Sequence, residues 1–416
     1  MKKTILLITS MFLAIFIVQE SYSQSAKRIF KDGEKLLEDK KYGEAIQKFD
    51  EAIKMDSTLA DAWAARGKAN YELGDINKAI HDYEFSIKYD QKDEEKYYQL
   101  ARLYYKTDEY KKSIAMADKA IEEGRKHVKA HQIKLYSLAK TKQYNKAITV
   151  AKKAIELEDN ALNYYNLGVV QDSLKKYNDA EYNYKMASSL NINFPDAYVA
   201  LANVLFKKQE YDEALKIANE AVKNFPKDLS AWEVRSRIFH AKKDYTRAIN
   251  DLSQMIVLSP DDKNIYLRRG VYYKEFNQIQ NAINDFTKVI SLSPDEYSAY
   301  NLRARCYDEI ENKEKAILDF KKVAKMDVPG NMRIYAKTRL YDLQREENKP
   351  EIIIELPKPL NKRTLEVPSD AIYVTVKGKI NDQSNIKYIK AADEEIDFTN
   401  YEDSLTVFND SIEIGR

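Results

Sequence analysis

The sequence reads Tyr42-Gly43-Glu44-Ala45-Ile46 near its start, and this short motif recurs along most of the chain. A fixed period of about 34 residues is typical of repeat proteins, in which each unit packs on its neighbours. Positions are numbered below from the alanine, so that position −12 lies twelve residues before it. At spacings of 34, 34, 34, 33, 34, 34, 34 and 34 residues, this anchor is followed by Ala79, Ser113, Ala147, Ala180, Ala214, Ala248, Ala282 and Ala316.

Other positions keep the same phase and predict two helices, A and B, in each repeat. Large apolar residues recur at helical spacing before and after a short polar turn, as at Leu201 and Leu205 and then at Ile217. Small residues at positions −12 and 0 would let helices A and B approach closely. Position −12 carries Gly33, Gly67, Ala101, Gly168, Ala202, Ser236, Gly270 and Ala304, with Leu135 as the one large exception.

Three prolines repeat with the same period. Pro226, Pro260 and Pro294 are 34 residues apart. Proline is tolerated in the first turn of a helix, where its missing N–H costs little. We therefore expect each of these prolines to lie in the first turn of the next helix A.

This arrangement closely resembles the tetratricopeptide repeat family. The resemblance covers residues 24–330 as nine repeats, and it implies an all-α solenoid, a right-handed superhelix of antiparallel helix pairs. Residues 331–347 are expected to form a C-terminal capping helix, with Ile334 and Tyr335 among its apolar positions.

In this family helix A lines a concave groove that binds protein or peptide partners, so the resemblance also implies a binding surface. Tyrosine and arginine dominate the energetics of many interfaces. The alternative is that the tyrosines merely pack against one another. The residues placed in the groove by the resemblance are Tyr71, Tyr98, Arg102, Tyr105, Tyr136, Tyr165, Asn203, Phe206, Arg237, Asn301 and Arg305, with acids at Asp61, Glu95, Asp172, Asp196 and Glu233.

Some members of the family clamp two carboxylates with a lysine and an asparagine four residues apart on helix A. Asn203 stands at the matching position, but Val199 replaces the lysine. No repeat completes the set, so this clamp is not expected.

Composition narrows the possible functions. The chain has 68 Lys and Arg against 66 Asp and Glu, which argues against a nucleic-acid partner. Ten glycines and nine prolines in 416 residues predict few tight turns. The single cysteine, Cys306, is expected to be buried, and it excludes a disulfide framework within the chain.

No pattern in the sequence points to catalysis. His127 and His131 are four residues apart, but no third metal ligand accompanies them. Phosphate-binding loops and the nucleophile elbow are also missing from the sequence. We expect no catalytic residues, no metal and no cofactor.

Residues 1–23 have the character of a secretory signal peptide. Two lysines follow the first methionine, residues 5–18 form an apolar run, and small residues stand at Ser21 and Ser23. Cleavage is expected after Ser23, with an uncleaved N-terminal anchor as the alternative. No later segment is apolar enough to span a membrane. We therefore expect an exported protein, periplasmic or secreted, with attachment to the outer membrane through a partner as a further option.

The composition changes after the repeats. Residues 348–370 form a proline-rich linker that includes a first strand, and residues 371–416 are β-rich. The stretch 376–386 weakly resembles the strand–turn–strand of bacterial Ig-like modules. A full sandwich of that type is longer. A small module, one that borrows strands from a partner, and a chain truncated from a longer protein all remain open.

The expected function is an exported scaffold that binds a protein or peptide of the cell envelope without chemistry. Two alternatives come from other classes. The chain could be the non-catalytic part of a longer enzyme or signalling protein, or its tyrosine-rich groove could bind glycan or peptidoglycan.

Overall fold

The structure is a computed structural model of the chain, and it describes residues 23–347 and six short strands that follow them. Apart from Ser23, the predicted signal peptide lies outside the described residues, as does most of the linker 348–370. The chain divides into two compact units, Met1–Val234 and Arg235–Arg416, which are described separately.

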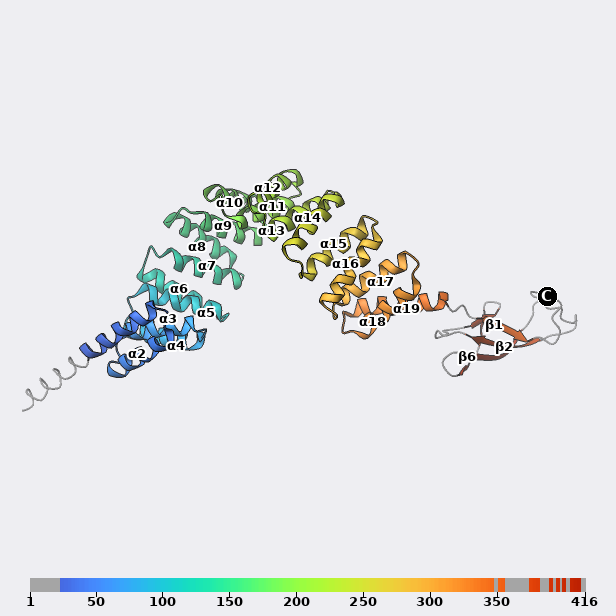
Figure 1. The fold of residues 1–416 in the computed structure, drawn as a ribbon, viewed down its shortest axis with the longest axis horizontal. Helices are drawn as coiled ribbons and strands as arrows, with labels where there is room; N and C mark the ends of the chain where they lie inside the picture. The colour runs from blue at the N-terminus through green and yellow to red at the C-terminus, as the bar shows by residue number, and fades with distance from the viewer. Residues whose placement is uncertain are drawn as a thin grey trace, which may run out of the picture. The chain divides into compact units, whose positions relative to one another are not determined.

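The first unit is a row of antiparallel helix pairs (Figure 1). Residues 23–38 form the first helix A. Even-numbered helices are then helices B, and odd-numbered helices are helices A. The unit contains α2 (Tyr42–Met55), α3 (Ala60–Glu72), α4 (Ile76–Tyr89), α5 (Glu94–Lys106), α6 (Tyr110–Glu123), α7 (Val128–Lys140), α8 (Tyr144–Leu157), α9 (Ala161–Ser173), α10 (Tyr177–Leu190), α11 (Pro195–Lys207) and α12 (Tyr211–Asn224), while α13 (Leu229–Ala241) contains the boundary.

The second unit continues the same pattern and then changes to strands. Its helices are α14 (Tyr245–Leu258), α15 (Lys263–Glu275), α16 (Ile279–Leu292), α17 (Tyr297–Glu309), α18 (Lys313–Lys325) and α19 (Gly330–Glu347). Its strands are β1 (Glu351–Glu355), β2 (Val374–Asn381), β3 (Ile389–Ala391), β4 (Glu394–Ile396), β5 (Thr399–Tyr401) and β6 (Leu405–Ile412). They pair antiparallel in the order β1-β2-β6-β5, with β3-β4 as a separate pair.

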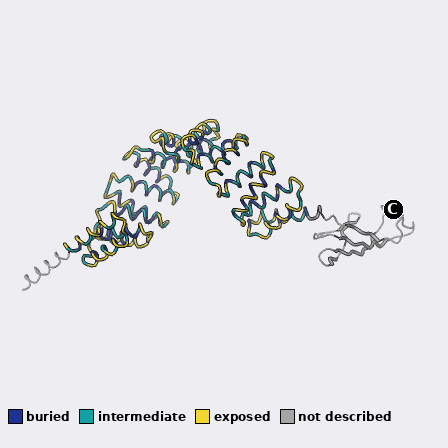
Figure 2. Tube along the Cα trace, in the orientation of Figure 1, coloured by how far each residue is buried: buried dark blue, intermediate teal, exposed yellow. Residues whose placement is uncertain are grey.

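The predicted close approach of helices A and B is confirmed. All nine anchor residues are 0% exposed. A Cβ added to Gly168 would lie 2.7 Å from the Tyr184 ring, and one added to Gly270 would lie 2.6 Å from the Phe286 ring. Glycine at position −12 therefore makes room for an aromatic ring at position +4 of the facing helix B. Because helices A and B meet at this contact, their facing sides are the buried ones; Figure 2 colours the trace by burial.

The exception at position −12 is compensated within the same repeat. Leu135 is buried where other repeats have small residues, and the facing position +4 is Ala151 instead of an aromatic ring. Repeat 4 therefore places the large residue on helix A and the small one on helix B, the reverse of the glycine repeats. Repeat 3 has a small residue on both sides, Ala101 and Ala117, and Ile133 packs in the same cluster.

The expectation of few tight turns is wrong. Each repeat joins its helices A and B by a tight turn whose residue at position −5 has a positive φ, and only Gly74 among the nine is glycine. At Gln209, for example, φ is 64°. The next amide, of Glu210, donates to the Leu205 carbonyl over 3.0 Å, which is the Schellman end of a helix. Lysine, aspartate, asparagine, glutamine and glutamate thus adopt a conformation that usually selects glycine.

The prediction for the periodic prolines is also wrong. Pro226 lies in the turn before α13, three residues ahead of its first residue, Leu229. Its carbonyl accepts a hydrogen bond from Trp232 Nε1 over 2.9 Å. Pro260 accepts one from the Tyr266 hydroxyl over 3.0 Å. Pro226 and Pro260 therefore belong to turns, and their carbonyls bond the aromatic side chain at position −16. Among the residues that the structure describes, only Pro195 begins a helix.

An arginine–aspartate pair recurs in four repeats with a spacing of 16 residues. The arginine at position −13 of helix A forms two hydrogen bonds to the aspartate at position +3 of its own helix B. In repeat 8, Arg269 also donates to Ser253 on the preceding helix B over 2.9 Å, so it joins two repeats. The pairs are Arg66–Asp82, Arg235–Asp251, Arg269–Asp285 and Arg303–Asp319, with Nη2–Oδ1 distances of 2.6, 2.7, 2.7 and 2.9 Å.

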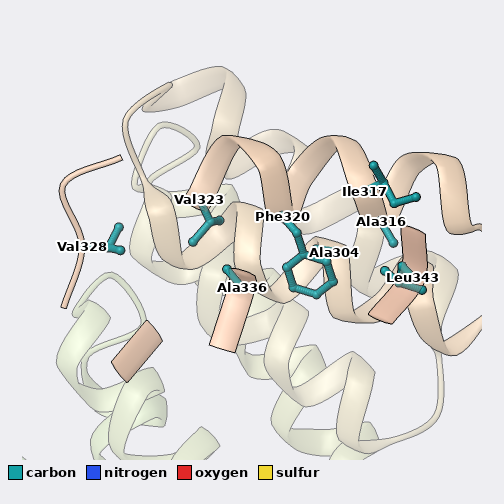
Figure 3. Packing of buried hydrophobic residues seen from close by; sticks show 8 residues of the cluster. All are labelled: Ala304, Ala316, Ile317, Phe320, Val323, Val328, Ala336 and Leu343. Atoms are coloured by element: carbon teal, nitrogen blue, oxygen red, sulfur yellow. The ribbon is translucent and has the colours of Figure 1, made fainter. Parts of the chain in front are cut away.

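The last helix, α19, covers the end of repeat 9. Its Ala336 and Leu343 complete a buried cluster with Phe320 and neighbouring residues of α17 and α18 (Figure 3). Ile334 was expected among the apolar positions of this helix, but it is 68% exposed. Of the two apolar positions named from the sequence, Tyr335 packs with its ring 6.1 Å from the Phe320 ring, and only Ile334 lies outside the packed face.

We predict opposite effects for two glycine-to-alanine changes. Gly168→Ala should destabilise the protein by about 1–3 kcal/mol, because the new Cβ overlaps the Tyr184 ring. Gly43→Ala, in the first turn of α2, meets no atom within 4 Å and should be neutral or stabilising by at most about 1 kcal/mol. Urea unfolding of both variants checks this. Equal effects would contradict the role assigned to position −12.

We predict that the buried side chain of His131 makes the stability of the folded protein sensitive to acid. It occupies the aromatic position −16, it is buried, and this burial lowers the pKa of its imidazole below 6.5. The unfolded chain therefore binds a proton more readily, and stability should fall as pH drops below about 6.5. His131→Tyr, which matches Tyr164 in the next repeat, should reduce this loss. Thermal midpoints between pH 7.5 and 5 measure it, and parallel curves for the two proteins would contradict it.

Candidate functional site

The predicted groove residues of the first unit lie on one face of its helices A. We call this the helix-A face, and define it by positions −18, −15, −11 and −8. These positions are three or four residues apart, so their side chains share one stripe of each helix. Neighbouring helices A are in contact, as in α5 with α7 and α9 with α11, so the stripes adjoin. From this unit the stripe takes Tyr71, Tyr98, Arg102, Tyr105, Tyr136, Tyr165, Asn203 and Phe206, and all eight are half-buried.

Arg102 is the centre of the first cluster on this face. Its guanidinium carbon lies 5.7 Å from the ring of Tyr71 on α3 and 5.7 Å from the ring of Tyr98 on its own helix. The ring of Tyr71 also meets the ammonium of Lys106 at 5.1 Å. Two cations therefore lie against one tyrosine, an arrangement in which cation–π attraction holds the long side chains in place.

A cavity of about 350 Å³ opens beside this cluster, between α3 and α5. Tyr71 and Arg102 line it together with charged residues of both helices, and Ala64, Leu103 and Tyr83 provide apolar wall. Tyr83 is buried, and burial raises the pKa of its hydroxyl, so the ring stays neutral. We call this cavity the α3–α5 pocket.

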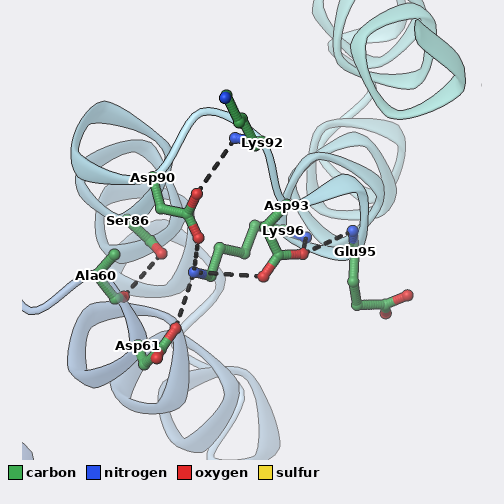
Figure 4. Close-up of polar contacts among 8 residues, drawn as sticks. All are labelled: Ala60, Asp61, Ser86, Asp90, Lys92, Asp93, Glu95 and Lys96. Carbon is green, nitrogen blue, oxygen red and sulfur yellow. Dashed lines mark hydrogen bonds and ion pairs between the residues drawn. The ribbon is translucent and has the colours of Figure 1, made fainter. Parts of the chain in front are cut away.

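One wall of the pocket is a buried ammonium with three carboxylates around it (Figure 4). The Nζ of Lys96 lies 2.8 Å from Asp61, 2.8 Å from Asp90 and 3.3 Å from Asp93. Burial alone would lower the pKa of this ammonium, but the hydrogen bonds to Asp61 and Asp90 raise it above its usual range. Lys96 is thus permanently charged and fully paired, and Asp61 is engaged in this network.

The next contacts run from the pocket toward α7. Glu95 accepts a hydrogen bond from Gln99, and its other oxygen lies 3.3 Å from Nε2 of His127. The His127 ring lies 5.0 Å from the Tyr98 ring, and its Nδ1 accepts from the amide of Ala130 at the start of α7. His127 is therefore a helix cap that also orders this part of the face.

Three further aromatic contacts continue the face across α5, α7 and α9. The rings of Tyr105 and Tyr136 are 6.3 Å apart, and the Tyr136 hydroxyl accepts a hydrogen bond from Asn166 over 3.0 Å. Burial raises the pKa of this hydroxyl. On α9, the ring of Tyr165 lies 5.0 Å from Phe194 and 5.7 Å from Tyr184.

An apolar stretch with direct solvent access adjoins these tyrosines. Leu162 and Val169 occupy positions −18 and −11 of α9 and are 41% and 38% exposed. On α11, Phe206 lies 5.6 Å from the Tyr211 ring. The face thus changes from tyrosines and cations on α5 to aliphatic side chains on α9.

The predicted site residues of the second unit lie on two helices, Arg237 on α13 and both Asn301 and Arg305 on α17. Arg237 is half-buried in α13. Arg305 on α17 donates from Nε to the Tyr335 hydroxyl over 3.2 Å, and its guanidinium carbon lies 4.5 Å from that ring. The prediction that Asn301 lines the groove is wrong, because this residue is buried and only 6% exposed. Its short amide does not reach the surface that the long side chains Tyr98 and Tyr165 reach at the same repeat position.

Sequence reasoning missed a ladder of contacts between neighbouring repeats. Position −8 of one repeat bonds position −7 of the next, as Asp172 does with Lys207 over 2.6 Å. In the second unit His240 meets Glu275 at 2.6 Å, and its ring stacks on Tyr272 at 4.0 Å. The sequence could have indicated these contacts, because the two positions carry opposite charges in consecutive repeats, as in Asp172 and Lys207. Asp172, placed among the groove acids, is therefore engaged in this ladder.

The described part of the chain was next compared with the requirements of a metal site, a reactive thiol and a membrane-spanning helix. No group of three or more His, Cys, Asp or Glu side chains is placed there to hold a metal ion. Cys306 is buried as expected, and burial raises the pKa of its thiol to about 11, which disfavours the reactive thiolate. Among those same residues, no helix combines the length and the apolar character needed to cross a bilayer.

Sequence models of known families match the chain along the repeats. A model described as tetratricopeptide repeat matches residues 199–263, and one described as TPR repeat matches residues 33–74. A third, also described as tetratricopeptide repeat, matches residues 60–93, 96–123, 128–160, 264–296 and 297–327. None of the curated proteins compared with the chain matches it.

Solved structures that are similar to the chain are distant from it in sequence. The APC/C hetero-tetramer Cut9-Hcn1 is 18% identical, with a TM-score of 0.44 over 64% of this chain and 52% of that chain. YrrB, described as a TPR protein with an unusual peptide-binding site, is 23% identical, with a TM-score of 0.36 over 43% and 93%. The C-terminal part of a TPR repeat-containing protein from Cytophaga hutchinsonii is 14% identical, with a TM-score of 0.49 over 57% and 98%.

The family models span most of residues 33–327, and the antiparallel helix pairs of both units keep the same 34-residue period. The chain therefore belongs to the tetratricopeptide repeat family.

Proposed function

We propose that the chain is a scaffold that binds a protein or peptide partner of the cell envelope on the helix-A face of its first unit. The observation that carries this proposal is the continuous row of half-buried tyrosines on α3, α5, α7 and α9, followed by exposed aliphatic residues. Aromatic side chains with a wet edge and a packed body are typical of interface anchors.

The geometry favours binding because the surface is already ordered. Tyr136 is held by Asn166, Tyr165 by Phe194, and Arg102 by two tyrosine rings. Side chains fixed before binding lose little conformational entropy when a partner arrives. Leu162 and Val169 then offer apolar surface whose burial stabilises the complex. The function is binding without catalysis.

A charged residue in the apolar stretch should weaken binding and leave the fold intact. We expect Leu162→Glu and Val169→Glu each to weaken peptide binding at least about tenfold, because burying a carboxylate against apolar groups is costly. The assay is selection from a displayed random-peptide library on the full chain, followed by titration of the selected peptides. The matched control is Tyr182→Glu, a 61% exposed residue of α10, on a helix B. Equal affinities for all three variants, or no selected peptide, would reject the proposal.

We further propose that the protein is exported and that its C-terminal strands dock it to the envelope as a small Ig-like module. The lysines and apolar run of residues 1–23 support export, and the antiparallel pairing of β1, β2 and β6 supports a β-module. N-terminal sequencing of the native protein should give Gln24 in an exported fraction. Deletion of residues 349–416 should release the protein from the envelope fraction. A native chain that begins at Met1 inside the cell would contradict export.

A further inference from the structure

We infer that one edge of the first unit docks the protein on an anionic lipid bilayer. The edge is built from the turns between helices A and B in repeats 3, 4 and 5, at positions −7 to −1. We call it the lysine edge, and it comprises residues 106–112, 140–146 and 173–179. None of the four positions that define the helix-A face belongs to it, so this inference goes beyond the proposed function.

The lysine edge carries an excess of positive charge. It contains eight lysines and three acidic residues, Asp108, Glu109 and Asp179, so its formal net charge is +5. The same positions of repeats 1, 2 and 6 have a net charge of −1 in each repeat. Consecutive helices from α5 to α10 pack against one another, so the three positive turns follow one another along one edge.

Most of these lysines can meet an external anion. All eight are exposed, and Lys112 pairs with a carboxylate of the edge, that of Glu109, over 2.6 Å. The other seven form no ion pair with a carboxylate among the described residues. The acids that flank the third turn, Asp172 and Glu181, are bonded to lysines outside the edge. The positive charge of the edge is therefore not neutralised by its surroundings.

Local helix energetics do not account for these lysines. Lys111 and Lys112 lie in the first turn of α6, and Lys146 lies in the first turn of α8. A helix N-terminus favours acidic side chains and disfavours basic ones. The first turn of α12 follows this rule with Asp212 and Glu213, whereas the first turns of α6 and α8 hold no acidic residue. The lysines thus occupy positions that cost helix stability, which indicates a role outside the fold.

The residue types of the edge favour a lipid surface over a protein partner. The edge contains no arginine. Lysine is a hydrated point charge without the fork that recognises a single carboxylate, and it is depleted at interfaces between proteins. Clusters of basic residues beside a bilayer are, by contrast, typical of binding to anionic lipid head groups. A layer of such head groups can meet all three turns at once.

The tyrosines at position −3 suit the same surface. Tyr110, Tyr144 and Tyr177 are the first residues of α6, α8 and α10, and each of them is half-buried. A packed ring with a wet hydroxyl is typical of the boundary between a bilayer and water. Repeats 1 and 6 also have tyrosine at this position, so the lysines are the feature that distinguishes the edge.

Docking through the lysine edge is compatible with the proposed role of the C-terminal strands. A single electrostatic contact gives reversible attachment to a bilayer, and stable attachment takes a second contact. The C-terminal strands would supply that second contact. The helix-A face would stay available to its partner while the lysine edge meets the lipid.

The test measures sedimentation of the full chain with two kinds of vesicle, phosphatidylcholine alone and an equal mixture of phosphatidylcholine and phosphatidylglycerol. The apolar run of residues 5–18 can meet both kinds, so the quantity compared is the ratio of the two affinities. The wild type should bind the anionic vesicles at least about tenfold more tightly, and this preference should fall as salt is raised. The triple variant Lys140→Glu, Lys142→Glu, Lys146→Glu should lose most of the preference, and glutamine at the same three positions should remove part of it.

The matched control reverses three exposed lysines of repeat 6, as Lys216→Glu, Lys223→Glu and Lys227→Glu, and should keep the preference. The two triple variants change the net charge equally. Glu311 shows that glutamate is accepted at position −5, where Lys142 stands, and unfolding midpoints check that each variant is folded.

Three outcomes would overturn the inference. They are an equal loss of preference in the two triple variants, no preference in the wild type, and tight binding of polyglutamate without binding to anionic vesicles, which would assign the edge to an acidic protein. The peptide selections that test the proposed function are made without lipid, so each of these outcomes leaves that proposal standing.

Discussion

The contact between positions −12 and +4 sets the distance between helices A and B, and the rest of the structure depends on it. In four repeats a glycine on helix A receives an aromatic ring from helix B, with no room for a methyl group at Gly33, Gly168 or Gly270. Because this contact fixes how each helix A is seated, it also fixes which of its residues face outward. The row of tyrosines is aligned across repeats for that reason.

Most of the fold could be predicted from the sequence, because the same two helices pack against each other in every repeat and need similar residues at the same positions. The period and the small residues at position −12 directly reflect helix contacts. The place of the turn between helices A and B could be predicted, but its positive φ could not, because composition reports only the intrinsic preference of each residue type. Eight non-glycine residues such as Gln209 adopt a positive φ, at about 1–2 kcal/mol each, and at Gln209 the hydrogen bonds that end helix A accompany it. Leu135 also breaks the pattern of small residues at position −12. The compensating residue, Ala151, lies sixteen residues further along the chain, so the sequence pattern does not show the contact directly.

The candidate site was predictable only in part. Repeat phase placed Tyr71 and Arg102 on the same face, and the structure brings them together from two helices. Phase could not show that Lys96 is saturated by three aspartates, since that depends on how two repeats meet. Repeat phase also placed Asn301 on the exposed surface, where it does not lie. An asparagine side chain is too short to reach the surface that a tyrosine reaches from the same repeat position. Repeat phase therefore names candidate residues, and only the contacts show which of them are already engaged within the protein.

The arginine–aspartate pairs have a consequence for how the repeats come apart. They occur in repeats 2, 7, 8 and 9, whereas repeat 6 places Leu201 and Ile217 at the same two positions. In a repeat array, stability is a sum of units and of the interfaces between neighbours. Salt screens ion pairs, whereas it does not weaken apolar contacts. Repeats 2, 7, 8 and 9 should therefore lose more stability in added salt than repeat 6, which holds the same two helices together with apolar side chains.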